Sequence, residues 1–238
     1  MKIKKYQNLL AMPVLLLAFI MLMTSSGLAA VQFSDIQGHW AEAAIKKTAA
    51  EGIVKGYPDG TFKPDHNISR AEFATIIVQA FKLEKREGKV FGDTGSHWAK
   101  DYIATANAHG IVSDYDEQKF GPDGLITREE MALMIVKAAG LKVTAGGIDA
   151  SDSSQVAAWA RDAVATAYAS KVIVGMPDGS FQPQANATRA QAVLVLNRAL
   201  ELAAEPIDAP ETETPAAPPE TTGEVTGGSS SGGGGGGG

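Results

Sequence analysis

The chain has 238 residues, with 21 lysines and arginines against 27 aspartates and glutamates, and its formal net charge is −6. Because the whole chain is acidic, nucleic acid and anionic lipid surfaces are poor partners for it. It contains no cysteine, which excludes disulfides, zinc–thiolate sites and cysteine nucleophiles.

Residues 1–30 are typical of an export signal. Lysines among the first five residues precede an uncharged, mostly apolar stretch at residues 9–23, and Ala29 and Ala30 suit signal peptidase cleavage after either residue. An uncleaved membrane anchor is the alternative, but a spanning helix needs about 20 apolar residues, and this stretch is shorter. We therefore expect an exported protein that has no membrane anchor after cleavage.

The following segment consists of three copies of one unit. Each copy has a tryptophan followed by alanine, a phenylalanine 22 residues later, a proline two residues beyond that, and an arginine eight residues after the phenylalanine. These internal spacings are constant, and only the lengths of the segments that connect the copies vary. The sequence therefore predicts three tandem repeats. Their expected bounds are 31–86, 87–144 and 145–204.

Each repeat is expected to fold as helix, loop, helix. The first helix begins near the tryptophan and ends near a residue such as Gly52 or Gly110, because a left-handed glycine commonly closes a helix. The second helix begins with a capping box, such as Ser69 with Glu72, and its apolar residues follow one helical face. One such pair cannot bury its apolar face alone. We therefore predict an all-α, three-lobed bundle with a pseudo-threefold axis, the second helices at its centre, and a groove between neighbouring lobes.

An arginine occupies the first position of each second helix: Arg70, Arg128 and Arg189. A cation there faces the positive end of the helix dipole, at a cost of roughly 0.3–1 kcal/mol. Free N–H groups at a helix start favour an anion, and an arginine beside them adds a charge-assisted, bidentate donor. These residues predict an anion-binding helix start. The alternative is that the arginines pair with loop acids, such as Asp59, Asp123 or Asp178.

The motifs at these spacings resemble the S-layer homology (SLH) domain. In the first repeat they are Phe33-Ser34-Asp35, His39-Trp40-Ala41, Gly56-Tyr57-Pro58-Asp59-Gly60, Phe62, Pro64 and Ile68-Ser69-Arg70-Ala71-Glu72. The resemblance covers residues 31–203 and implies a three-lobed helical bundle that holds a protein on the bacterial cell wall or S-layer. It also implies non-covalent binding of secondary cell-wall polysaccharide, typically at an end bearing pyruvylated N-acetylmannosamine, whose carboxylate would be the arginine's anion.

The other candidate ligand-binding residues each have two interpretations. The tryptophan of each repeat is either lobe core or a stacking platform for a sugar. An aspartate before each first helix either caps a helix or braces a loop, or it binds sugar hydroxyls. A loop glycine either permits a turn or lets a ligand approach the backbone. These residues are Trp40, Trp98, Trp159, Asp35, Asp93, Asp152, Gly56 and Gly175.

The copies differ at positions that affect an anion. The second copy has Asp114 and Asp116 in place of a loop glycine and proline, and two acids should weaken anion binding in the groove that uses this loop. The third copy has Gln191 in place of the capping glutamate, which still completes a capping box and removes a negative charge. It also has Ala150 where the others have phenylalanine, so its lobe should pack less tightly at its start.

Other function classes find less support in the sequence. The four histidines form no repeating set with an acid and a serine at a catalytic spacing, so we expect no catalytic residue and no cofactor. The loop at Asp59 lacks the alternating acids and final glutamate of a calcium loop, so we expect no metal site. Residues 205–238, rich in Pro, Thr and Glu and then in Gly and Ser, are expected to form a disordered linker. A longer exported enzyme, an S-layer lattice protein carrying this anchor, and a peptidoglycan-binding module remain alternatives.

Overall fold

The computed structural model describes residues 32–113 and 118–204. The expected export signal, the linker, and Asp114 and Asp116 lie outside the described residues. Within these residues the chain forms α-helices and two short 3₁₀-helices, with no β-strand, which confirms the all-α prediction. The elements are α2 (Glu42–Ala50), α3 (Arg70–Ala80), α4 (Lys100–Ala108), α5 (Arg128–Ala138), η1 (Ser153–Gln155), η2 (Ala158–Ala160), α6 (Arg161–Ala169) and α7 (Arg189–Ala204). No helix in this part of the chain is long and apolar enough to cross a membrane.

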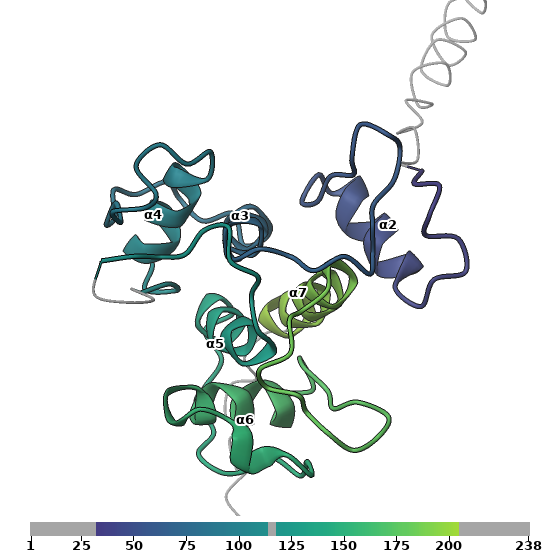
Figure 1. Cartoon of the computed structure of the whole chain (residues 1–238), viewed down its shortest axis with the longest axis vertical. Helices are drawn as coiled ribbons and strands as arrows, with labels where there is room; N and C mark the ends of the chain where they lie inside the picture. The colour runs from purple at the N-terminus through teal and green to yellow at the C-terminus, as the bar shows by residue number, and fades with distance from the viewer. Residues whose placement is uncertain (1–31, 114–117, 205–238) are drawn as a thin grey trace, which may run out of the picture. The chain divides into compact units, whose positions relative to one another are not determined.

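The second helix of each repeat lies at the centre, as predicted. α3, α5 and α7 pack against one another, and α2, α4 and α6 lie outside them (Figure 1). Each outer helix packs on the central helix of the preceding repeat, so α4 contacts α3, α6 contacts α5, and α2 closes the ring on α7. The helix pair of one repeat is therefore not a packing unit, and every lobe combines two repeats.

A ring of backbone hydrogen bonds joins the three segments that precede the central helices. The N–H of Ile68 donates to the carbonyl of Ala187 at 3.0 Å, Ala187 donates to Ile126 at 2.9 Å, and Ile126 donates back to Ile68 at 3.1 Å. Because each segment donates to one neighbour and accepts from the other, the ring needs all three copies.

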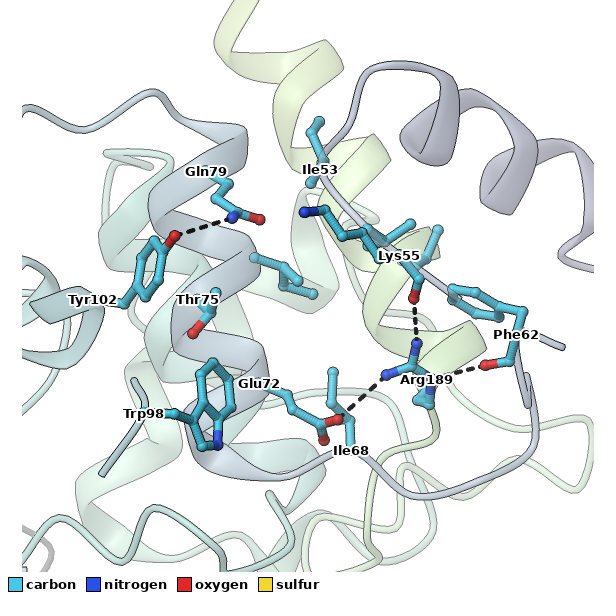
Figure 2. A pocket seen from close by; sticks show the side chains of 13 residues that line it. Ile53, Lys55, Phe62, Ile68, Glu72, Thr75, Gln79, Trp98, Tyr102 and Arg189 are labelled. Atoms are coloured by element: carbon cyan, nitrogen blue, oxygen red, sulfur yellow. Dashed lines mark hydrogen bonds and ion pairs between the residues drawn. The ribbon is translucent and has the colours of Figure 1, made fainter. Parts of the chain in front are cut away.

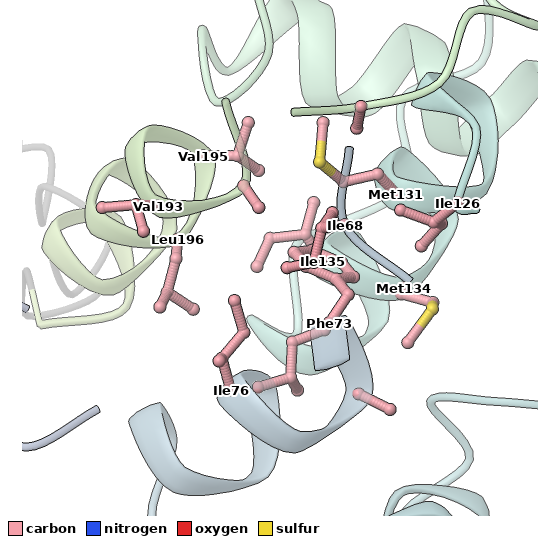
Figure 3. Close-up of a cluster of buried hydrophobic side chains, with 14 of the residues drawn as sticks. Ile68, Phe73, Ile76, Ile126, Met131, Met134, Ile135, Val193, Val195 and Leu196 are labelled. Atoms are coloured by element: carbon pink, nitrogen blue, oxygen red, sulfur yellow. The ribbon is translucent and has the colours of Figure 1, made fainter. Parts of the chain in front are cut away.

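The apolar faces of the central helices meet around the axis. Phe73, Ile77, Met131, Ile135 and Leu196 are completely buried, and Figure 3 shows side chains from all three helices converging there. Burying one such side chain contributes about 1.5–3 kcal/mol. This shared core explains why the repeats fold together.

The predicted helix ends are confirmed. Ser69 Oγ accepts the N–H of Glu72 at 3.2 Å and Glu72 Oε2 accepts the N–H of Ser69 at 2.8 Å, which makes a capping box at the start of α3. Gly52 follows α2 with φ +72° and Gly110 follows α4 with φ +73°. In the third copy Lys171 takes the same left-handed conformation, at φ +58°.

Candidate functional site

Each arginine reaches from its own helix start to the next repeat. Its Nε donates to the backbone carbonyl of that repeat's phenylalanine, and its guanidinium lies over the ring of the same phenylalanine. The pairs are Arg70–Phe120, Arg128–Phe181 and Arg189–Phe62, with Nε···O distances of 2.9, 2.8 and 3.0 Å. We call these three contacts the Arg70, Arg128 and Arg189 joints.

A capping glutamate of the next repeat neutralises the arginine at two joints. Arg70 forms an ion pair with Glu130, and Arg189 Nη1 lies 3.4 Å from Glu72 Oε1. The corresponding residue at the third joint is Gln191, so Arg128 has no such carboxylate. The arginines at two joints therefore pair with acids of the chain, as in the alternative interpretation, but the partners are the capping glutamates and not the loop aspartates.

The prediction of free N–H groups at the helix starts is wrong. The N–H of Arg70 donates to the carbonyl of Gly124 at 2.9 Å, and that of Ala71 donates to Pro122 at 3.0 Å. Equivalent bonds from the next repeat's loop occupy the starts of α5 and α7. The loop of a neighbouring repeat thus takes the place of an anion at the backbone of each helix start, which leaves anion recognition to side chains.

A cavity of about 350 Å³ opens beside Arg189 (Figure 2). We call it the Arg189 groove. Its walls come from all three repeats, in agreement with the predicted groove between neighbouring lobes. Its lining includes Ile53, Val54, Lys55, Glu72, Thr75, Ile76, Gln79, Trp98, Tyr102 and Arg189. Gln79 Nε2 donates to the hydroxyl of Tyr102 at 3.4 Å, and most of the other lining side chains are apolar.

The same arrangement recurs one repeat further along the chain. The Arg70 groove has a volume of about 550 Å³ and is lined by Arg70, Ile111, Val112, Ser113, Glu130, Leu133, Met134, Lys137 and Trp159. In the repeat register, Lys137 takes the place of Gln79, and Trp159 that of Trp98. Two similar grooves therefore follow from the repetition of one sequence unit.

The tryptophans are surface residues, and their interpretation as lobe core is wrong. Trp40, Trp98 and Trp159 are 59, 61 and 55% exposed. Trp98 lines the Arg189 groove and also borders a neighbouring cavity of about 560 Å³ that includes Lys85 and Lys100. An exposed indole at a groove wall offers an apolar ring face to a ligand.

The aspartates brace the loop that supplies the arginine's acceptor. Asp35 accepts the N–H of Phe62 at 2.8 Å and that of Lys63 at 2.7 Å. Asp93 and Asp152 hold the corresponding residues of their own repeats in the same way. Burial raises the pKa of Asp35, but its hydrogen bonds to backbone N–H groups outweigh burial and hold the pKa below its usual value. The loop-bracing interpretation therefore accounts for the contacts of these carboxylates.

The loop glycines pack closely against the backbone of their own loops. A Cβ at Gly56 would lie 2.6 Å from the carbonyl oxygen of Thr61, and one at Gly175 would lie 3.1 Å from that of Ser180. Backbone packing within the repeat therefore accounts for both glycines. No group of three or more His, Asp or Glu side chains in the described residues could hold a metal ion.

Several groove residues were not identified from sequence. The sequence marks Glu72 and its counterpart Glu130 as helix caps but not as partners of another repeat's arginine, and it gives no separate signal for Gln79, Tyr102 or Lys55. These groove residues can be identified by aligning the three repeats. Once one groove is known, the residues at equivalent positions line the next.

Comparison with known proteins identifies the family. A sequence profile of the S-layer homology domain matches residues 32–74, 90–132 and 151–193. The chain is 31% identical to an amylopullulanase of Thermoanaerobacterium thermosulfurigenes over 71% of its own length, and 37% identical to a cellulosome-anchoring protein of Acetivibrio thermocellus over 44%. It is 36% identical to S-layer protein EA1 of Bacillus anthracis over 48% of its length. The chain spans only 9, 25 and 14% of these relatives. Since the three profile matches cover more than half of the chain, it belongs to the S-layer homology domain family.

Proposed function

We propose that this chain is a bacterial cell-surface anchoring module that binds a cell-wall polysaccharide without catalysing a reaction on it. Relatives named as a cellulosome-anchoring protein and as S-layer proteins support this role. The amylopullulanase and an endoglucanase of a Bacillus strain share only 9 and 19% of their length with this chain. This small shared fraction is expected when one anchoring module is joined to different domains, such as those of enzymes or surface-lattice proteins.

The single observation that carries the proposal is the exposed tryptophan at the wall of each described groove. Trp98 presents its indole beside the polar side chains of Gln79 and Tyr102. A sugar has an apolar ring face and a rim of hydroxyls, so it needs an aromatic surface with hydrogen-bonding groups next to it. The Arg189 groove offers both, and the Arg70 groove repeats the indole as Trp159.

The favoured ligand is an acidic secondary cell-wall polysaccharide of the type that ends in pyruvylated N-acetylmannosamine. A carboxylate on the sugar suits a guanidinium at the groove, because charge-assisted hydrogen bonds are stronger than neutral ones. The anchored position would be the outer face of the cell wall, which agrees with the export signal expected at residues 1–30.

The test is sedimentation of the purified protein with isolated cell walls, before and after extraction of the secondary polysaccharide. We expect the protein to sediment with complete walls and to stay in solution with extracted walls. A variant with both Trp98→Ala and Trp159→Ala lacks the exposed indoles of the two grooves and should sediment less with complete walls than the unchanged protein does. Equal sedimentation with both wall preparations would refute the polysaccharide proposal and favour peptidoglycan as the ligand.

A further inference from the structure

A second cavity lies beside the Arg189 groove and shares part of its wall. It has a volume of about 560 Å³ and is formed by the end of α3, the segment that follows α3, and α4. We call it the Lys100 cavity. Trp98 and Tyr102 line both the Lys100 cavity and the Arg189 groove, and Figure 2 shows both side chains on the side of the groove opposite Arg189. A polymer that occupies the groove can therefore continue past the indole of Trp98 into the cavity.

The Lys100 cavity is positively charged although the whole chain is acidic. Its charged lining consists of Lys85, Lys100 and Asp101. Lys85 Nζ lies 2.7 Å from Asp101 Oδ2, in an ion pair whose side chains are 76 and 64% exposed. The pKa of Asp101 is lowered by this hydrogen bond and by the charges of both lysines, so one carboxylate serves two ammonium groups. The lining therefore keeps an excess positive charge, and a cleft with such a lining attracts anions.

A fixed side chain supports the indole that borders both cavities. The ring of His97 packs on Trp98 with the ring centroids 5.3 Å apart. His97 Nε2 lies 3.2 Å from Asp123 Oδ1, and His97 Nδ1 accepts the N–H of Ala99 at 3.2 Å. Because both ring nitrogens already have partners, His97 forms a wall and leaves the lysines to recognise an anion. A wall that is fixed in advance lowers the entropy cost of binding.

The fold does not require the two lysines. In the repeat register Lys100 corresponds to Glu42 in the first repeat and to Arg161 in the third, and Lys85 corresponds to Val143. The outer helices α2 and α6 form with these other residues in place. Substitutions of the two lysines should therefore leave the fold intact, and a change in binding can be attributed to the cavity itself.

We propose that the Lys100 cavity binds an anionic group, a phosphate or a carboxylate, on the unit of the wall polymer next to the unit in the Arg189 groove. Lysine ammonium groups form charge-assisted hydrogen bonds with either anion. Val78 and Leu83 line the same cavity and suit the apolar face of a sugar ring. This inference rests on the proposed polysaccharide function and adds to it a second binding site across Trp98, away from the arginines of the three joints.

The test measures by calorimetry the affinity of the purified full chain for soluble wall polysaccharide. Lys100→Gln should weaken binding at least threefold with an unchanged melting temperature. Lys142→Gln removes the same charge from an exposed lysine that lines none of the cavities described above, and should change affinity less than twofold. Asp101→Asn removes the only carboxylate from the cavity lining and should strengthen binding, which loss of a structural ion pair would not do.

Polymer whose carboxyl groups have been reduced to alcohols identifies the anion. If Lys100→Gln weakens binding of reduced polymer as much as it weakens binding of native polymer, the cavity binds a phosphate, and if its effect disappears, the cavity binds a carboxylate. Equal affinity of the unchanged protein and folded Lys100→Gln for native polymer, or weaker binding by Asp101→Asn, would overturn the inference while leaving polysaccharide binding in place. If native polymer did not bind the unchanged protein, the proposed function itself would fail.

Discussion

Glu72 and Arg189 join the first and last repeats of the chain. One carboxylate oxygen of Glu72 caps its own helix through Ser69, and the other lies 3.4 Å from Nη1 of Arg189. The same glutamate therefore stabilises a helix start and neutralises a cation that begins another helix. At the Arg70 joint, Glu130 makes the same two kinds of contact.

Because of these contacts, Arg70→Ala should destabilise the protein. The side chains of Arg70 and Glu130 are only 11 and 12% exposed, and removing one partner of a largely buried pair leaves the other charge uncompensated. We expect the free energy of unfolding to fall by about 3 kcal/mol, measured by urea denaturation. Lys47→Ala removes an exposed ion pair with Glu201 and should cost less than about 1 kcal/mol. Equal effects of the two substitutions would contradict a structural role for Arg70.

The sequence predicted the local features of the fold but not the contacts between copies. Capping boxes, helix-ending glycines and amphipathic faces depend on neighbours within a few residues, so Ser69, Glu72 and Gly52 could be interpreted directly. Three copies with the same spacing give no indication of whether an arginine contacts its own repeat or the next. The packing of one repeat on the next leaves Trp98 exposed. It also gives the backbone N–H groups near Arg70 their carbonyl acceptors.

Deletion of the third repeat should unfold the remainder. Without α7 the outer helix α2 loses the central helix on which it packs, and Ile68 loses the carbonyl of Ala187. A chain ending at residue 144 should therefore show little helix by circular dichroism and no cooperative thermal transition. A cooperative transition in this two-repeat chain would show that the ring is not needed for folding.

Trp98→Ala should weaken ligand binding with little loss of stability. Because the side chain is 61% exposed, its removal should change the free energy of unfolding by no more than about 0.5–1 kcal/mol. Loss of the stacking surface should lower affinity for wall polymer about tenfold, which corresponds to about 1.4 kcal/mol. Val143→Ala is a suitable control, since Val143 is also 61% exposed and lines neither groove. A large fall in melting temperature for Trp98→Ala would indicate a structural role instead.

Acid should weaken the fold partly through the loop-bracing aspartates. Burial raises the pKa of Asp93, but its hydrogen bonds from the N–H groups of Phe120 and Gly121 outweigh burial and hold the pKa below the usual value. A group whose pKa is lower in the folded state contributes stability above its unfolded pKa of about 4, and this contribution disappears as the pH falls through the folded value. The difference in melting temperature between the unchanged protein and Asp93→Asn should therefore be largest near neutral pH and shrink below about pH 4. A difference that stayed constant from about pH 7 to pH 2 would show that the charge of Asp93 does not stabilise the loop.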